Sequence, residues 1–353
     1  MSAPVFSVPT VDIAPYVTGG DAAERAMAAR SMDDACRTVG FVQVTGHGIP
    51  EVVTDALAAA LDHFFALAPE VKARYRVEGA NRGYSPPKSE ALSLSAGIDA
   101  PARMNDFFEA FNVGVEARSF THLELDEADY GRNVWPDEAG AAFRDPVETY
   151  FAEAARVART LTTIFADALG VPVEFFDDLT GHSIDVLRMN NYALPPGTVV
   201  PGADLTGMGE HTDFGIVTVL WADRVAGLQV LGSDGEWHDV APAPGALLVN
   251  LGDLTARLTN DRWMSTLHRV KPPLVDGTIV RRRSAAFFHD GNADAVIAPL
   301  PTCPPAAGRP YDPVTVREHI AAKLGGSRLG KLNTRADREA ARLASAVPHV
   351  PVE

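Results

Sequence analysis

HTDFGIVTVLWADRVAGLQVLGSDGEWHDVAPAPGALLVNLGDL, residues 211–254, is the stretch that decides the fold. Short runs rich in β-branched and aliphatic residues alternate here with turn residues such as Gly227 and Ser233-Asp234-Gly235. Similar runs recur over residues 184–289, and they are IDVLRMNNY (184–192), GIVTVLWA (215–222), GLQVLG (227–232), EWHDVA (236–241), ALLVNL (246–251), STLHRVK (265–271) and VRRRSAAFF (280–288). Many short strands separated by turns predict a sandwich or barrel of jelly-roll size.

Helical patterns flank this β-rich region on both sides. Residues 21–38 predict a helix with Asp21 as its N-cap, and a second helix should begin just after Pro50. A long helix is expected over residues 146–169, ended by Gly170, and a last helix over 314–324. The apolar stripes of the second and third helices are Val53, Leu57, Leu61, Phe64 and Phe65, and Tyr150, Ala154, Val157, Leu161, Ile164 and Leu169. The fold class is therefore mainly β with flanking α.

The helical and strand-like sequence patterns divide the chain into four ranges. We expect an N-terminal region of helices and first strands over 1–120, a long helical support over 121–180, the jelly-roll core over 181–300, and a C-terminal helix with a polar, mobile tail over 301–353. Within the first range, residues 79–105 are rich in Gly, Ser, Pro and Ala and predict a long surface excursion that covers a binding site.

Composition excludes several classes of partner. The 353 residues carry 31 Lys plus Arg and 46 Asp plus Glu, a net charge of −15, which disfavours binding to nucleic acid or an acidic membrane. Cys36 and Cys303 are the only cysteines and indicate neither a disulfide framework nor a thiolate metal site. No signal peptide and no apolar run long enough to span a membrane are present, so we expect a cytoplasmic protein without an obligate protein partner.

His211, Asp213 and His268 form the candidate metal site. Side chains alternate in an extended segment, so His211 and Asp213, at the opening of the 215–222 strand, should project to the same side. His268 lies 268 − 211 = 57 residues later in another β-like run, which a barrel can bring alongside. Two imidazoles and one carboxylate leave open coordination positions and suit iron(II) and oxygen chemistry.

Other histidines compete for the third position. An H-x-D pattern is common by chance, and the chain has ten histidines. His47, His238 and His289 are alternatives to His268 that spacing alone does not eliminate.

A run of three arginines indicates a second candidate site. Alternation along RRRSAAFF places Arg282 and Ser284 on one face of a strand and Arg281 and Arg283 on the other. A buried guanidinium beside a hydroxyl is a carboxylate receptor, because its fork matches two oxygens. For Arg281 and Arg283 we expect a solvated basic face.

Together these motifs resemble the isopenicillin N synthase-like family of iron(II)/2-oxoglutarate-dependent dioxygenases. The matching pieces are VPTVDIAPY, GFVQVTGHGIP, HTDFGIVTVL, GLQVLGSDGEWHDVAPAPGALLVNLGDL, STLHRV and RRRSAAFF, spread over residues 5–310. The resemblance implies a double-stranded β-helix, a distorted jelly roll, with helices packed outside it.

The resemblance also implies roles for individual residues. It places the iron ligands on His211, Asp213 and His268, and the pair that binds the distal carboxylate of 2-oxoglutarate on Arg282 and Ser284. LRMNNY resembles an N-x-Y element, which brings Asn190 and Tyr192 to the cosubstrate. PPLVDGT, between His268 and Arg282, departs from the family pattern and is expected to be an inserted hairpin turn.

The activity implied is oxidation of a small molecule by dioxygen with iron(II) and 2-oxoglutarate, releasing succinate and carbon dioxide, with ascorbate stimulatory. Hydroxylation is the default outcome, with desaturation or cyclisation as variations, and specialised metabolism is one setting for it. Candidate substrate residues by position in the family pattern are Arg82, Tyr84, Phe107, Phe108 and Phe111, although core packing is the favoured interpretation of the phenylalanines. Arg188 either lines the pocket or forms a structural ion pair.

Two other functions fit the same residues. A cosubstrate-free iron oxidase of the same fold could use Arg282 and Ser284 for a substrate carboxylate. A zinc hydrolase could use the same three ligands, but Arg282 and Ser284 would then have no purpose.

Overall fold

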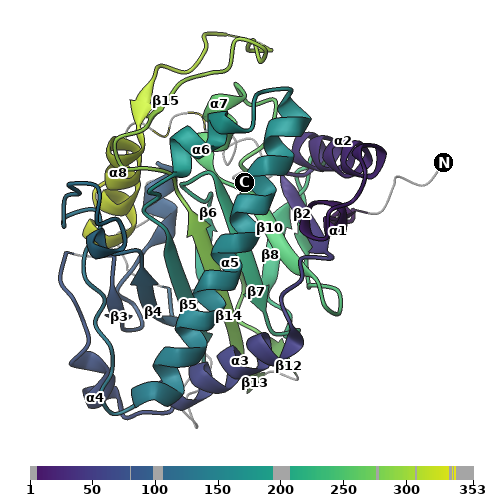
Figure 1. Ribbon diagram of the computed structural model, residues 1–353. Coiled ribbons are helices and arrows are strands. Elements are labelled where there is room, and N and C mark those ends of the chain that lie inside the picture. Colours follow the sequence, from purple (N-terminus) through teal and green to yellow (C-terminus); the bar gives the residue numbers. More distant parts are fainter. Residues whose placement is uncertain are drawn as a thin grey trace, which may run out of the picture.

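A computed structural model describes residues 6–79, 81–97, 106–193, 207–275, 278–306, 308–333, 336 and 338. Two sheets form the jelly-roll core that the sequence predicts, and helices pack outside it (Figure 1). The larger sheet has the order β1 (Thr10–Asp12), β2 (Phe41–Thr45), β10 (Leu247–Leu251), β7 (Val217–Ala222), β14 (Arg282–His289), β5 (Val186–Tyr192), β4 (Glu109–Gly114) and β3 (Gly83–Ser85). The smaller sheet has the order β6 (Met208–His211), β11 (His268–Val270), β8 (Leu228–Leu231) and β9 (Trp237–Asp239).

Two short antiparallel strand pairs lie outside the two main sheets. β12 (Leu274–Val275) pairs with β13 (Thr278–Ile279), which confirms a hairpin within the PPLVDGT insertion. β15 (Val296–Ile297) pairs with β16 (Val314–Thr315) just before the C-terminal helix.

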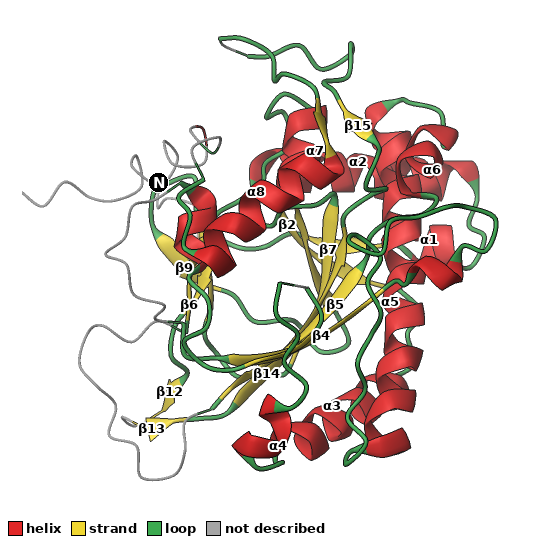
Figure 2. Cartoon of the chain, turned by 90° about the vertical axis from the view of Figure 1, so that its left-hand side faces the viewer, coloured by secondary structure: helices red, strands yellow, loops and turns green. Residues whose placement is uncertain are grey.

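Helices cover the outer face of the larger sheet and both ends of the core. They are α1 (Ala14–Val17), α2 (Ala22–Thr38), α3 (Glu51–Phe65), α4 (Pro69–Ala73), α5 (Gly140–Leu169), α6 (Glu174–Thr180), α7 (Asp253–Leu258) and α8 (Val316–Leu329), with 3₁₀ turns η1 (Leu92–Ala96) and η2 (Ala117–Ser119). Figure 2 shows α5 and α3 on one side of the larger sheet and strands of the smaller sheet on the other. None of the helices in the described ranges combines the length and apolar character required of a membrane span.

Helix α5 is the main support of the larger sheet. The predicted stripe from Tyr150 to Leu169 is buried along its whole length, and the helix packs against β7 and β14. The helix begins six residues earlier than predicted, because the fully buried Phe143 anchors an extra turn against Phe64 and Pro146 is accommodated inside it. Gly170 ends α5 with a φ of 67°, a left-handed conformation that glycine adopts without strain.

The other predicted helices are confirmed with small shifts. Asp21 caps α2 through a capping box with Glu24. Helix α8 runs five residues beyond the predicted 314–324, and Thr315 and Glu318 form a capping box at its start. Most of the tail predicted to be mobile, residues 325–353, lies outside the described residues, but its first five residues belong to α8, so the prediction is wrong for them.

Residues 79–105 only partly match the predicted surface excursion. Their described part forms β3 and the buried turn η1, which packs against α8 and β6. The four-range division stays a prediction, although strands β1 to β4 of the first range complete the same sheet as strands of the third.

Candidate metal centre and cosubstrate pocket

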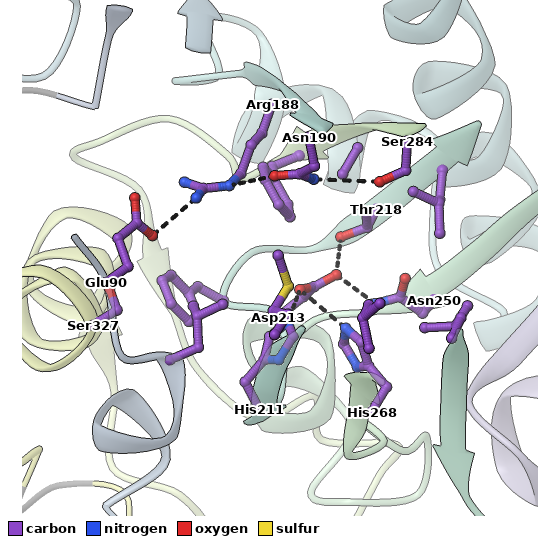
Figure 3. A pocket seen from close by; sticks show the side chains of 18 of the residues that line it. Glu90, Arg188, Asn190, His211, Asp213, Thr218, Asn250, His268, Ser284 and Ser327 are labelled. Atoms are coloured by element: carbon purple, nitrogen blue, oxygen red, sulfur yellow. Dashed lines mark hydrogen bonds and ion pairs between the residues drawn. The ribbon is translucent and has the colours of Figure 1, made fainter. Parts of the chain in front are cut away.

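His211, Asp213 and His268 converge in the wall of one cavity (Figure 3). One possible ligand atom of each lies within 4.8 Å of the others, and this is the only such group of three His, Cys, Asp or Glu residues among the residues described. Asp213 Oδ1 lies 3.6 Å from His268 Nε2 and 3.9 Å from His211 Nε2. All three side chains are buried.

Strand pairing in the smaller sheet brings the distant histidine into place. His268 opens β11 and lies directly opposite His211, the last residue of β6. The sequence interpretation placed H-T-D at the opening of the following strand, and this is wrong: β6 ends at His211, and Asp213 lies in the connection to β7. The motif thus sits where the chain passes from one sheet to the other.

Hydrogen bonds to backbone carbonyls fix the orientation of both imidazoles. His211 Nδ1 lies 2.7 Å from the Gly209 carbonyl and His268 Nδ1 lies 3.1 Å from the Thr266 carbonyl. A carbonyl only accepts, so each Nδ1 carries the proton and each Nε2 keeps a free lone pair. Burial, and next the neighbouring His268, lower the pKa of His211 to about 3, which keeps it neutral and able to ligate.

The carboxylate of Asp213 is oriented in the same way. Its Oδ2 accepts hydrogen bonds from Thr218 Oγ1 at 2.5 Å and from Asn250 Nδ2 at 2.6 Å. Oδ1 therefore remains directed toward the histidines. Neither supporting residue was identified from the sequence, although Asn250 is the only polar residue in ALLVNL and could have drawn notice.

Arg282, Ser284, Asn190 and Tyr192 meet across two neighbouring strands. In the β14–β5 pairing Arg282 lies opposite Tyr192 and Ser284 lies opposite Asn190, whose Nδ2 is 3.4 Å from Ser284 Oγ. The Arg282 guanidinium lies 5.1 Å from the centre of the Tyr192 ring.

Arg282 is the unusual member of this group. It is only 2% exposed, and its Nε and Nη1 have no hydrogen-bond partner among the described residues. Leaving charged donors buried and unpaired is costly. An anion with paired oxygens, such as a carboxylate, fits them.

A cavity of about 950 Å³, open solvent at its mouth included, joins the two groups. The inner faces of β5, β7 and β14 contribute alternate residues to its wall, which are Arg188, Asn190, Tyr192, Thr218, Leu220, Arg282, Ser284, Ala286 and Phe288. The alternation of side chains predicted for Arg282 and Ser284, in which every second residue faces the cavity, is thus present on three adjacent strands.

Arg281 and Arg283 lie on the opposite face, as alternation predicts, but they do not form a solvated basic face. Both guanidinium groups bind Asp62 of α3, and Arg283 also donates to Asp223. Their side chains are 36% and 23% exposed, so they join α3 to the larger sheet.

The competing histidines lie away from the triad. His47 Nε2 is 3.0 Å from the Gly245 carbonyl, and His238 pairs with Asp234 near the surface. His289 Nδ1 is 2.9 Å from Asp185 Oδ1.

Of the candidate substrate residues, Arg188 reaches the cavity. Arg82 does not line it, and donates instead to the carbonyls of Asn81, Val115 and Gly131. Tyr84 also lies outside it, with its hydroxyl on Glu109. Phe108 packs in the core beside Arg188, whose guanidinium lies 5.0 Å from the Phe108 ring centre.

Phe107 and Phe111 are fully buried core residues, in agreement with the interpretation favoured from the sequence.

Comparison with known families gives two matches along the chain. Residues 8–138 match the model for the N-terminal region of non-haem dioxygenases in morphine synthesis, and residues 183–291 match the 2-oxoglutarate–iron(II) oxygenase superfamily. Among curated proteins, the 2-oxoglutarate–Fe(II) type oxidoreductase hxnY of Emericella nidulans is 34% identical over 318 residues, 88% of each chain. The 2-oxoglutarate-dependent dioxygenase citB of Monascus ruber is 32% identical over 89% of this chain and 94% of its own.

Solved structures agree with these relatives. A full-length Neurospora crassa protein in complex with α-ketoglutarate and thymine superposes with a TM-score of 0.76 at 26% identity, covering 90% of this chain and 96% of that one. A 2-oxoglutarate–Fe(II) oxygenase family protein from Caulobacter crescentus gives a TM-score of 0.73 at 27% identity over 91% and 99% of the two chains. The chain therefore belongs to the family of iron(II)- and 2-oxoglutarate-dependent dioxygenases, which oxidise small molecules.

Proposed function

We propose that this dioxygenase binds iron(II) through His211 Nε2, His268 Nε2 and Asp213 Oδ1, and binds the distal carboxylate of 2-oxoglutarate through Arg282 and Ser284. The observation that carries the second assignment is the buried Arg282 guanidinium with two unpartnered nitrogens in the wall of the same cavity. The expected outcome is hydroxylation of a small molecule.

The donor set fits the metal. Two neutral imidazoles and one carboxylate on a single face leave three coordination positions open, the arrangement associated with non-haem iron(II) oxygenases. When bound, iron(II) and 2-oxoglutarate supply the activation of dioxygen that oxidises a C–H bond, with succinate and carbon dioxide as co-products.

The remaining tasks fall to the chain itself. Backbone carbonyls of Gly209 and Thr266 fix the two imidazoles, and Thr218 with Asn250 fixes the carboxylate. Arg282 supplies paired donors, while Asn190 positions the Ser284 hydroxyl. Apolar residues such as Leu220, Phe288 and Leu228 line the cavity and exclude water from the reacting groups.

Succinate formation tests the proposal and separates it from the two alternatives. The iron(II)-loaded protein should release one succinate per dioxygen consumed and should be stimulated by ascorbate. A cosubstrate-free oxidase would consume dioxygen without forming succinate. A zinc hydrolase would neither consume dioxygen nor form succinate. The named relatives are 2-oxoglutarate enzymes, which favours the first outcome.

Arg282→Gln tests the cosubstrate assignment directly. Loss of a charged, bidentate contact worth about 2 kcal/mol corresponds to roughly 30-fold weaker binding of 2-oxoglutarate. The matched control is Arg262→Gln, a half-buried arginine that pairs with Asp33 outside the cavity. Equal 2-oxoglutarate affinity in the two variants would contradict the assignment.

Partner and location are part of the same proposal. A cavity lined by residues of both sheets suits a small molecule, and the net charge of −15 disfavours nucleic acid and acidic membranes. Cys36 and Cys303 are both buried free thiols, which is consistent with the cytoplasm as the proposed location.

A further inference from the structure

One carboxyl group in the cavity wall has no partner. The carboxyl groups among the described residues that line the cavity are those of Asp213, Glu90 and Asp290. Asp213 belongs to the proposed metal site, and Glu90 Oε2 accepts a hydrogen bond from Arg188 Nη2 at 2.9 Å. Asp290 is only 7% exposed, yet no hydrogen bond or ion pair from a described residue reaches its carboxyl. Burying a polar group without a partner is costly, so Asp290 is suited to binding a ligand group.

Strand alternation directs Asp290 into the cavity. Residues 282, 284, 286 and 288 of β14 all line it, and Asp290, which directly follows the strand, continues the same alternation. Asp290 lies 290 − 284 = 6 residues beyond Ser284, a distance of roughly 20 Å along an extended chain. A 2-oxoglutarate molecule bound to Arg282 and Ser284 is far too short to reach it. The Asp290 carboxyl therefore remains for a third ligand, the substrate.

The Asp290 carboxyl lies against the backbone next to the metal site. A Cβ at Gly215 would clash with Asp290 Oδ1, so this close approach depends on a glycine two residues after Asp213. One step back along β14, Phe288 lies opposite Thr218, whose hydroxyl donates to Asp213 Oδ2. A group bound to Asp290 would therefore lie beside the proposed metal centre.

The nearby part of α8 supplies apolar wall to the same cavity. The Arg317 amide, in the first turn of α8, donates to the Ala293 carbonyl, which joins this helix to the segment that follows Asp290. One turn later Ile320 and Leu324 line the cavity. A mainly apolar wall with one well-placed polar group is typical of a site that binds an apolar molecule and fixes its orientation through a single polar group.

The charge around Asp290 favours a cationic ligand group. Burial, and next the Asp185 carboxylate, raise the pKa of Asp290 well above its usual value. Asp185 accepts a hydrogen bond from Ser183 and lies 2.9 Å from His289 Nδ1, so it is held in place. Both acids disfavour an anionic ligand. An alcohol would satisfy Asp290 without offsetting the negative potential, whereas an ammonium group would do both and form a charge-assisted hydrogen bond.

We propose that Asp290 binds a basic nitrogen of the substrate, which is a small amine with an apolar body. The ammonium group donates to the Asp290 carboxylate, and the apolar body lies against Phe288 and the Ile320–Leu324 face of α8. This inference rests on the proposed iron and 2-oxoglutarate sites and adds the chemical class of the third ligand.

The test is direct binding to protein saturated with Mn²⁺ and 2-oxoglutarate under nitrogen, measured by calorimetry. The probes are benzylamine, 2-phenylethylamine and hexylamine, each compared with the alcohol and the carboxylate that carry the same hydrocarbon group. We expect at least one amine to bind about 30-fold or more tightly than its alcohol and its carboxylate. Equal binding of amine and alcohol, preference for the carboxylate, or binding of none of the amines would overturn the inference.

Variants assign the binding to Asp290. Asp290→Asn, which nearly preserves the shape of the side chain, should weaken amine binding by about 30-fold or more. Asp290→Ala should do the same, so a folding defect in one variant does not decide the result. Mn²⁺-dependent binding of 2-oxoglutarate should persist in both, which a collapse of the cavity would not allow. The control is Asp294→Asn, an exposed aspartate outside the cavity that pairs with His182, and it should bind the amine like the wild type.

The two proposals fail in different ways. If the proposed iron and 2-oxoglutarate sites were wrong, the wild-type protein would not bind 2-oxoglutarate in a Mn²⁺-dependent manner. If only the substrate class were wrong, that binding would persist while the preference for an amine, or its dependence on Asp290, was absent.

Discussion

The two carboxylate oxygens of Asp213 have different neighbours. Oδ1 faces the two histidines, whereas Oδ2 accepts hydrogen bonds from Thr218 and Asn250. A ligand oriented in this way loses little freedom when a metal binds, and loss of such an outer contact typically costs 10-fold to 100-fold in metal affinity.

Thr218→Val should therefore weaken metal binding by roughly 10-fold or more, because it removes the hydroxyl while nearly preserving the volume. The dissociation constant for Mn²⁺, measured by electron paramagnetic resonance, provides the check. Thr163→Val is a matched control, since that hydroxyl donates only to the Arg159 carbonyl on the surface of α5. An unchanged constant in Thr218→Val would show that the second hydrogen bond, from Asn250, is sufficient.

The single residue Asp106 makes the free energy of unfolding depend on pH. Burial raises its pKa from 3.8 to about 7, against the opposing hydrogen bonds from the Gly209 and Leu92 amides. Between these values the folded chain holds a proton that the unfolded chain releases, so its contribution to stability is present at low pH and is lost as pH rises from about 4 to 7. The full change is on the order of 4 kcal/mol.

Asp106→Asn removes this titration. The free energy of unfolding of the wild type relative to the variant should fall as pH rises from about 4 to 7 and stay level above that range. Urea unfolding of metal-free protein at several pH values measures the difference. A difference that does not depend on pH would mean that Asp106 is ionised throughout in the folded protein.

Alternation along a strand predicted the residues of the site that share one face, such as Arg282 with Ser284. It could not predict partners across strands, which explains why Thr218 and Asn250 were missed. Arg82 and Tyr84 were expected near the substrate by position alone, but their polar groups are satisfied elsewhere, by backbone carbonyls and by Glu109.

At the level of elements, α8 connects the C-terminal region to the segment His211-Thr212-Asp213. Lys323 of α8 is 1% exposed, and its Nζ lies 2.5 Å from Asp253 Oδ2 and 3.3 Å from Thr212 Oγ1. Thr212 lies between His211 and Asp213, and the Asp253 amide donates to the Asp213 carbonyl. Helices α7 and α8 thus support the backbone of the H-T-D segment.

Lys323→Met should destabilise the protein by about 3–5 kcal/mol, because it deprives a buried carboxylate of its ammonium partner. The double variant Lys323→Met/Asp253→Asn should recover part of this loss, which a double-mutant cycle in urea measures as a coupling energy. Additive losses in the cycle would contradict an energetic link between α8 and α7.

Sequence patterns predicted the helices better than the strand boundaries. The 3.6-residue period of α5 extends over many turns, whereas a strand of three or four residues such as β6 carries little signal of its own. For this reason H-T-D was assigned to the start of the next strand rather than to the end of β6.

At the scale of the whole molecule, the site bridges two sheets. His211 and His268 belong to the smaller sheet, whereas Arg282, Ser284, Asn190 and Tyr192 belong to the larger one. Pairing of strands 57 residues apart, between His211 and His268, depends on the order of all the intervening strands. Local periodicity does not encode that order, so the family resemblance, rather than spacing, singled out His268.

This arrangement predicts that metal and cosubstrate stabilise the fold cooperatively. A metal alone would join residues of the smaller sheet and its connection to β7, and 2-oxoglutarate bound to both the metal and Arg282 would link that group to the larger sheet. Each ligand at about 100 times its dissociation constant adds about 2.7 kcal/mol to the free energy of unfolding. Mn²⁺ should therefore raise the melting temperature alone, and 2-oxoglutarate should raise it further only when Mn²⁺ is present.

Two variants separate the stabilisation by Mn²⁺ from the stabilisation by 2-oxoglutarate, and thermal unfolding is the measurement. Arg282→Gln should keep the shift caused by Mn²⁺ and lose most of the further shift caused by 2-oxoglutarate, while Asp213→Ala should lose both. A chelator should return the wild type to the metal-free melting temperature, because the stabilisation depends on the bound ligands. If 2-oxoglutarate stabilised the wild type equally without metal, its binding would not connect the two sheets through the metal centre, and Arg282 would be an independent anion site.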